Sequence, residues 1–226
     1  MPQSALIVGN SDGIGLALTR NLLQRGWRVS GLSRSPSPVE HRDYTHRLVD
    51  VRSSDFGRRM EDCLDESTRL VIYCAGIGET FDASRPSQEI ATFEVNLMGL
   101  VKAATLAVPH FLASESGVFV GLSSMADIML SGTSPAYGAS KAGMSHYLES
   151  LALALRHSGV RIVNVRLGFV ATKMAKSSRT PWILHPETAA ARILRAALAD
   201  SPPRRLNIPR RMAVAVQVAR IFSRRS

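Results

Sequence analysis

A tyrosine and a lysine that could perform acid–base chemistry lie four residues apart, at Tyr137 and Lys141. Residues at this spacing share one face of a helix, and a helix is predicted over residues 136–156. A phenol with its ordinary pKa of about 10 is a poor acid–base group at neutral pH, and a nearby ammonium stabilises its phenolate. Ser124, thirteen residues upstream, could bind a substrate oxygen. Because such pairs also arise by chance, the alternative is an ordinary pair on a helix surface.

A second group of residues could hold a phosphate. The run Gly9-Asn10-Ser11-Asp12-Gly13-Ile14-Gly15 follows a predicted strand and opens a predicted helix. Glycines let backbone amides approach a pyrophosphate, and the helix N-terminus adds partial positive charge. The alternative is a plain glycine-rich turn, but the position directly after the first strand favours nucleotide binding.

These residues belong to a chain in which short apolar runs alternate with helical patterns. Strands are expected at residues 4–8, 28–32, 48–51, 70–74, 117–122 and 160–165, with a candidate seventh at 205–208. Helices are expected at residues 14–23, 54–64, 89–113, 136–156 and 186–199. This alternation predicts an α/β fold with a doubly wound, Rossmann-like parallel sheet in a single domain. Ligands are then expected at the carboxyl ends of the strands.

Composition is that of an ordinary globular protein with a core: 226 residues, 45% hydrophobic and 20% charged. Cys63 and Cys74 provide neither a disulfide framework nor metal-ligand spacing, so we expect no metal site and a cytoplasmic protein. The N-terminus lacks the basic region of a signal peptide. No uninterrupted apolar run reaches the roughly 18 residues of a membrane span.

Positive charge is concentrated at the C-terminus. The net charge of the chain is +10. Seven arginines follow Asp200 and no acidic residue does, so seven of these ten surplus charges lie after residue 200. We therefore expect a domain over residues 1–200 and a basic extension over 201–226, with a candidate last strand and a short helix. Residues 210–226 could form a short helix on an anionic membrane surface, but an ordinary C-terminal helix packed on its own domain or on a partner subunit is favoured. Without aromatic interleaving, no nucleic-acid partner is expected.

Taken together with Asn96, these motifs resemble those of the classical short-chain dehydrogenase/reductase family. The spacing Gly9-x-x-x-Gly13-x-Gly15 is similar to its glycine motif, and Asn96, Ser124, Tyr137 and Lys141 match its active tetrad. The resemblance covers about residues 4 to 200. It implies hydride transfer between NADP(H) and a small carbonyl or alcohol substrate, with Tyr137 as general acid/base. It also implies that Ser124 polarises the substrate oxygen, Lys141 lowers the tyrosine pKa and binds the nicotinamide ribose, and Asn96 holds a water.

The resemblance assigns further residues to the cofactor. Asp50-Val51 resembles the element that contacts adenine, although a strand-end aspartate can simply cap the next turn. Ala75-Gly76 matches the end of the family's Asn-Asn-Ala-Gly, with Tyr73-Cys74 in place of both asparagines. The segment from Leu167 to Thr172 resembles the family's Pro-Gly segment, which contacts the nicotinamide and pyrophosphate. Its contacting residues here are Gly168, Val170 and Thr172. Leu167 replaces the proline, and Val8 replaces the threonine before the first glycine.

Cofactor choice is expected to depend on Ser33 and Arg34, at the end of the second strand. A carboxylate there would repel a 2′-phosphate, whereas an arginine accommodates one, so NADP(H) is expected rather than NAD(H). The alternative is a solvated loop arginine.

Several apolar residues could line the substrate pocket or belong to the core: Met125, Ile128, Met129, Phe169, Met174 and Trp182. The resemblance implies a homodimer or homotetramer built on the long helices at 96–113 and 137–156. The competing function is an NADP(H)-binding regulatory protein with little or no turnover.

Overall fold

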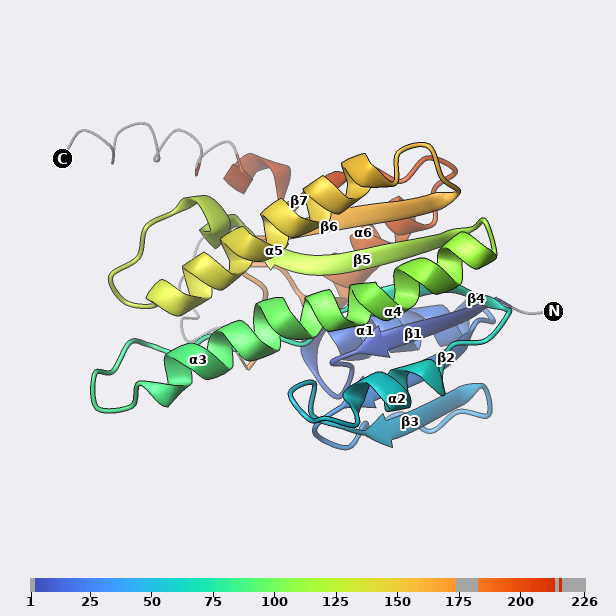
Figure 1. The fold of residues 1–226 in the computed structure, drawn as a ribbon, viewed down its shortest axis with the longest axis horizontal. Helices are drawn as coiled ribbons and strands as arrows, with labels where there is room; N and C mark the ends of the chain where they lie inside the picture. The colour runs from blue at the N-terminus through green and yellow to red at the C-terminus, as the bar shows by residue number, and fades with distance from the viewer. Residues whose placement is uncertain (1–2, 174–182, 214–215, 217–226) are drawn as a thin grey trace.

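A parallel sheet with both faces covered by helices organises the chain (Figure 1). The computed structural model describes residues 3–173, 183–213 and 216. The strands are β1 (Ser4–Val8), β2 (Arg28–Ser33), β3 (Tyr44–Leu48), β4 (Thr68–Tyr73), β5 (Gly117–Ser124), β6 (Val160–Leu167) and β7 (Arg205–Ile208). They pair in the order β3-β2-β1-β4-β5-β6-β7, and every pairing is parallel. The predicted doubly wound α/β fold is confirmed.

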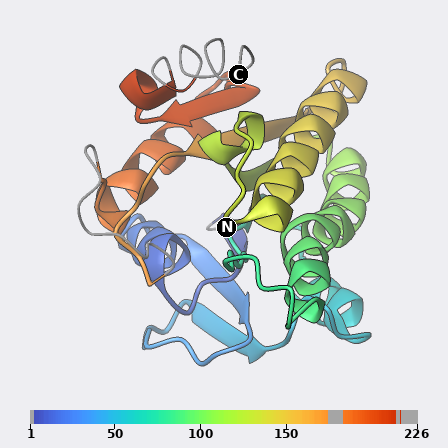
Figure 2. The ribbon, with the colours of Figure 1, turned by 90° about the vertical axis from the view of Figure 1, so that its left-hand side faces the viewer.

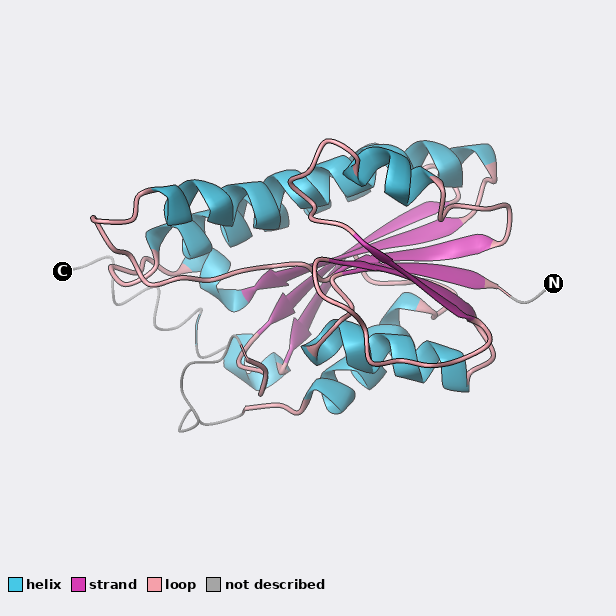
Figure 3. Ribbon diagram, turned by 90° about the horizontal axis from the view of Figure 1, so that it is seen from below, coloured by secondary structure: helices cyan, strands magenta, loops and turns pink. Residues whose placement is uncertain are grey.

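Helices form a layer on each face of this sheet, as Figure 3 shows from below. The helices are α1 (Gly13–Gln24), α2 (Phe56–Glu61), α3 (Ser87–Phe93), the π-helical turn η1 (Glu94–Met98), α4 (Gly99–Ala113), the 3-10 turn η2 (Met125–Ile128), α5 (Pro135–Ala154) and α6 (Pro186–Ala197). In Figure 2, α1 and α6 lie on one side of the sheet and the longer α4 and α5 on the other.

The central strands are apolar because both of their faces are buried. Ala5 and Ile7 of β1 point toward α1 and α6, in one core cluster. Leu6 and Val8 point the other way, into the cluster that α4 and α5 complete. A strand buried on two sides therefore reads as a continuous apolar run, which is why β1 and β4 were recognisable in the sequence.

The prediction of a third strand at residues 48–51 was wrong. The strand is β3 (Tyr44–Leu48), and its side chains are only half-buried or exposed because it is the edge of the sheet. Val49 and Val51 are buried, but they lie in the turn after the strand, where they pack in the second core cluster. The apolar residues from which a strand was predicted therefore lie in the turn, and not in the edge strand itself. The helix expected at 54–64 is also shorter, at α2.

A single long helical segment, Ser87–Ala113, combines α3, η1 and α4. Its length and mean hydropathy of 1.4 would suffice for a membrane span by composition alone. The segment nevertheless packs on the sheet through Leu100, Ala103, Ala107 and Phe111, all of which are buried. A core helix of an α/β sheet accounts for its apolar character.

The candidate seventh strand is confirmed as β7, which pairs with β6 at the edge of the sheet. Residues 210–213 are helical. Residues 214–215 and 217–226 lie outside the described part of the chain. They make up most of the 210–226 tail for which a membrane surface was considered. Met174 and Trp182 also lie outside it.

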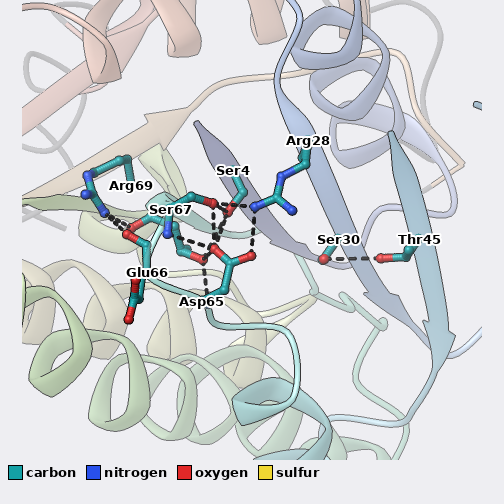
Figure 4. A network of polar contacts seen from close by, with 9 residues as sticks. Ser4, Arg28, Ser30, Thr45, Asp65, Glu66, Ser67 and Arg69 are labelled. Carbon is teal, nitrogen blue, oxygen red and sulfur yellow. Dashed lines mark hydrogen bonds and ion pairs between the residues drawn. The ribbon is translucent and has the colours of Figure 1, made fainter. Parts of the chain in front are cut away.

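A polar cluster ties together the amino ends of β1, β2 and β4, at the end of the sheet away from the glycine turn (Figure 4). The Asp65 carboxylate accepts hydrogen bonds from the hydroxyls of Ser4 and Ser67, at 3.1 and 2.6 Å. It also pairs with Arg28 at 2.9 Å. These contacts join three segments that the sheet brings side by side, so their role is structural.

Candidate active site

The candidate site residues lie at the carboxyl ends of six strands, which meet along one side of the parallel sheet. Figure 2 looks onto these strand ends. In sheet order from β3 to β6, the residues that end or follow the strands are Asp50, Ser33, Gly9, Ala75, Ser124 and Gly168. The structure therefore gathers residues that lie far apart in the sequence.

The glycine turn is closed tightly against the neighbouring strand. Gly9 has φ of 86°, in the region that favours glycine, and a Cβ there would overlap the backbone nitrogen of Ala75. Asp12 caps α1 by accepting the Gly13 amide at 2.7 Å, and it pairs with Lys173 at 2.9 Å. The hydrogen bond from Lys173, together with that from the Gly13 amide, lowers the pKa of Asp12. The carboxyl group is therefore an anion at the helix N-terminus.

The segment after β6 lies opposite this turn. The amide of Gly168 donates to the Ile208 carbonyl at 2.8 Å, and Val170 forms a bridge with Leu184. These bonds bring Thr172 beside the glycine turn, where its methyl group would lie 3.0 Å from a Cβ on Gly13. The backbone amides at the N-terminus of a helix are donors of the kind that binds a phosphate, and Thr172 lies beside them in this site.

The end of β2 is ordered by side-chain contacts. The buried Ser33 hydroxyl donates to the Ser35 carbonyl at 2.8 Å and contacts Nε2 of His46 at 2.7 Å. Arg34, between these serines, is exposed. Asp50 accepts the amide and guanidinium of Arg52, and the Arg52 side-chain hydrogen bond is the main cause that lowers the pKa of Asp50. The charge of Arg34 makes a smaller contribution to the lowering of the Asp50 pKa, so the two side chains lie close enough to interact electrostatically.

Lys141 is a buried ammonium with a fixed position. Its Nζ donates to the Leu122 carbonyl at 2.8 Å and lies 5.8 Å from the centroid of the Tyr137 ring. Burial lowers the pKa of Lys141 to about 8. The predicted pairing of the two side chains on one helix face is found in α5.

Tyr137 lies between Lys141, Ser124 and the loop after β4. Burial raises the pKa of Tyr137, and a hydrogen bond with Ser124 offsets part of that rise. The lowering of this pKa by Lys141 that the family resemblance implies stays a prediction; the ammonium donates to the Leu122 carbonyl and lies 5.8 Å from the centroid of the ring. A Cβ on Gly78 would lie 2.9 Å from a carbon of the ring, so this loop packs directly on the tyrosine.

Ser124 occupies the last position of β5. Its hydroxyl accepts the Ala126 amide at 3.1 Å, which caps η2, and it donates to the Leu167 carbonyl at 3.4 Å. The serine thus connects β5, β6 and the turn that follows, with Tyr137 as a further neighbour.

Asn96 is completely buried within η1. Its Oδ1 accepts the Ile77 amide at 2.8 Å, and its Nδ2 donates to the Ile77 carbonyl and to the Ser140 hydroxyl, both at 2.9 Å. Ser140 in turn donates to the carbonyl of Tyr137 at 2.9 Å. Asn96 therefore connects the loop after β4 with the first turns of α5.

Sequence reasoning missed residues that support these groups. Asn10, inside the glycine turn, is buried and donates to Tyr44 at 2.6 Å and to Thr19 at 3.3 Å. Ser140 was part of the Tyr-x-x-x-Lys segment but was not singled out. Only their position next to recognised motifs could have indicated either residue, since isolated polar residues have no distinctive spacing.

A buried ion pair was also missed. Asp127 of η2 and Arg166 of β6 are paired, with side chains 4% exposed. Ser145 of α5 donates to Asp127 at 2.6 Å. The pair fixes the turn that follows Ser124 against β6 and α5. Within the described residues, no group of three histidine, cysteine or acidic side chains could hold a metal.

Comparisons with known proteins show similar sequences and similar folds. A family model described as short chain dehydrogenase matches residues 3–182. An uncharacterised oxidoreductase of Myxococcus xanthus is 30% identical over 231 residues, which cover 93% of this chain and 91% of the relative. The very-long-chain 3-oxoacyl-CoA reductase of Anas platyrhynchos is 26% identical over 194 residues, which cover 77% of this chain and 62% of that protein.

Solved structures share the fold. A short chain dehydrogenase from Burkholderia cenocepacia, in complex with NADP, gives a TM-score of 0.83 at 21% identity and covers 100% of this chain and 96% of its own. The closed form of a serine dehydrogenase complexed with NADP+ also gives 0.83, at 18% identity, with 91% and 94% covered.

The close approach of the glycine turn to Ala75 predicts that Gly9→Ala destabilises the fold more than Gly26→Ala does. Gly26 has a similar φ of 77° but no atom within 4 Å of an added Cβ, so it isolates the conformational cost. We expect about 1 kcal/mol for Gly26→Ala and at least about 1–2 kcal/mol more for Gly9→Ala, from the overlap. Urea unfolding of both variants measures the difference. Equal losses would show that the contact with Ala75 is easily relieved.

Proposed function

The chain belongs to the short-chain dehydrogenase/reductase family of oxidoreductases acting on CH–OH and C=O groups, and we propose that it interconverts a carbonyl compound and its secondary alcohol with NADP(H). The observation that carries the proposal is the grouping of Ser124, Tyr137 and Lys141 at the carboxyl ends of the strands, with Asn96 bound to the same helix through Ser140. These residues would supply the acid–base groups and a hydroxyl for the substrate oxygen, beside a glycine turn that would bind the phosphates.

The preference for NADP(H) is supported by the end of β2. Arg34 is exposed there between two serines, where a 2′-phosphate could receive charge-assisted hydrogen bonds. The similar structures from Burkholderia cenocepacia and of serine dehydrogenase contain NADP. The glycine turn and Thr172 would hold the pyrophosphate, and Asp50 with Val51 would lie toward the adenine. Ala75, Gly76, Gly168 and Val170 would complete the binding surface.

In the proposed mechanism, NADP(H) when bound supplies the hydride to the carbonyl carbon. Tyr137 donates its phenolic proton to the carbonyl oxygen, and the Ser124 hydroxyl hydrogen-bonds that oxygen and polarises it. The fixed ammonium of Lys141 stabilises the phenolate left behind and would bind the nicotinamide ribose. Asn96 holds the tyrosine's helix through Ser140 and would position a water for proton return.

An apolar substrate is favoured by the residues near the site. Phe169, directly after Gly168, is 43% exposed, and Leu130, two residues beyond η2, is fully exposed. The Phe81 amide donates to the Thr133 carbonyl, so the loop that carries the 51% exposed Phe81 joins the loop that carries Leu130. Of the other pocket candidates, Met125 is buried and belongs to the interior, while Ile128 and Met129 are partly buried.

A homodimer or homotetramer is supported by apolar side chains that the long helices leave exposed. Ile90, Met98 and Leu112, on α3, η1 and α4, are 63%, 47% and 43% exposed, and Leu153 of α5 is 48% exposed. Burying these side chains between subunits would remove apolar area from water. The competing function, regulatory NADP(H) binding without turnover, would leave the buried Lys141 and its neighbouring phenol without a task. Steady-state NADPH oxidation with a panel of ketones and aldehydes separates the two.

Tyr137→Phe should lower kcat to less than about a tenth of the wild-type value, because the proton donor acts in the transition state. NADPH affinity, measured by fluorescence, should be nearly unchanged. Tyr147→Phe is the matched control, since Tyr147 is a half-buried tyrosine of the same helix outside the proposed site. Turnover by Tyr137→Phe comparable to that control would contradict the assignment.

Arg34→Ala should reduce kcat/KM for NADPH about ten- to a hundredfold and leave that for NADH nearly unchanged, since a charged phosphate bond contributes about 1.5–3 kcal/mol. Arg42→Ala is the control, because Arg42 lies in the same connection between β2 and β3 with its side chain 91% exposed. Equal losses with both cofactors would make Arg34 a structural residue and leave the cofactor open.

For carbonyl reduction, kcat/KM should fall as the pH rises through about 8, the lowered pKa of Lys141. The ammonium is present below that pH and lost above it, and kcat/KM reports ionisations of the free enzyme. In Lys141→Arg the charge persists, so whatever activity remains should not decline in this range. A profile that stays flat to pH 10 in the wild type, or an unchanged decline in Lys141→Arg, would refute this role.

A further inference from the structure

Tyr73 ends β4 at the position where the family motif has its first asparagine. The side chain is completely buried, and its hydroxyl donates to the carbonyl of Val95 at 2.5 Å. Burial raises the pKa of Tyr73, so the phenol keeps the proton that it donates. This bond connects the central sheet to the π-helical turn η1.

The π turn and the tyrosine fit one another closely. In η1 the Gly99 amide donates to the carbonyl of Glu94, five residues earlier, instead of the four of an α-helix. The next carbonyl, that of Val95, receives the Tyr73 hydroxyl. A Cβ on Gly99 would overlap this hydroxyl, so the helix approaches the tyrosine as closely as it does only because residue 99 is glycine.

Asn96 directly follows the carbonyl that Tyr73 binds. Its side chain must meet both the Ile77 backbone and Ser140, which lie on different segments. A shift of η1 along or around the helix axis would break these bonds together. The position of Asn96 is therefore sensitive to how Val95 is held.

We propose that Tyr73 is a positioning residue that fixes the π turn through the Val95 carbonyl and thereby sets Asn96 for the reaction. This inference rests on the proposed function only for its effect on turnover. Its structural part, that the hydroxyl orders residues 94–99, stands independently.

Tyr73→Phe tests the proposal because it removes only the hydroxyl. We expect kcat for carbonyl reduction to fall about tenfold, with KM and NADPH affinity changed less than about twofold, since a small misplacement of a supporting group acts mainly on the transition state. Amide hydrogen exchange at residues 94–99 and at Ile77 should accelerate about tenfold as the turn loosens. Tyr147→Phe, which removes a hydroxyl from a tyrosine packed against the same core cluster, should change neither measurement.

Gly99→Ala is the second variant, because it keeps the hydroxyl but displaces it from Val95. It should reproduce the loss in kcat and the faster exchange. Combining it with Tyr73→Phe should cost less than the sum of the two single changes, because both disturb one bond. In the Tyr73→Phe background, Asn96→Ala should likewise lower kcat only slightly further.

The possible outcomes separate the two claims. Full kcat in Tyr73→Phe, or faster exchange at 94–99 without a loss in kcat, would overturn the positioning role and leave Tyr73 as a packing residue. Unchanged exchange would overturn the structural part. A wild-type protein that oxidises NADPH with no carbonyl in the panel would refute the proposed function, while the exchange experiment would still decide whether the Tyr73 hydroxyl orders η1.

Discussion

The complete burial of the Asn96 amide is the constraint on which the site depends. A buried amide must find hydrogen-bond partners or lose several kcal/mol, and here the partners come from the loop after β4 and from α5. Those segments lie beside η1 because α4 and α5 lie side by side on one face of the sheet. Asn96 meets both partners from within the π turn, in the layer of helices that covers this face of the sheet.

A second buried polar group constrains the other side of α5. The Asp127–Arg166 pair joins η2 to β6, and Ser145 connects it to α5, so the turn after Ser124 is bound on two sides. Burying an ion pair costs desolvation and contributes little net stability, but it penalises any arrangement in which one partner is left alone. Asn96 binds Ser140 near the start of α5, and Asp127 binds Ser145 near its middle. The helix that carries Tyr137 and Lys141 therefore has little freedom to shift.

Much of this architecture could be predicted from the sequence, and the failures have physical causes. Strands buried on both faces, such as β1 and β4, appear as apolar runs, and the spacing of Tyr137 and Lys141 follows directly from helix geometry. The edge strand β3 was misplaced because only one of its faces has anything to pack against, while the buried Val49 and Val51 belong to a turn. The π turn could not be predicted, because the residues that meet there, Tyr73, Val95 and Gly99, are distant in sequence or of common types. The hydrogen bond from Lys141 to the Leu122 carbonyl likewise could not be predicted, because the two residues lie 19 positions apart.

Burial acts in opposite directions on the two titrating groups of the site. It raises the pKa of Tyr137 and lowers that of Lys141 to about 8, because each neutral form is easier to bury than its ion. Near neutral pH the phenol therefore keeps its proton, and the ammonium still keeps its charge. For the proposed reaction this state is ready to give a proton to a carbonyl oxygen, whereas alcohol oxidation first requires a phenolate, which burial disfavours. Raising the pH favours the phenolate but removes the charge of Lys141 that would stabilise it. In the proposed reaction the same burial would therefore favour reduction near neutrality and would limit how far alkaline conditions favour oxidation.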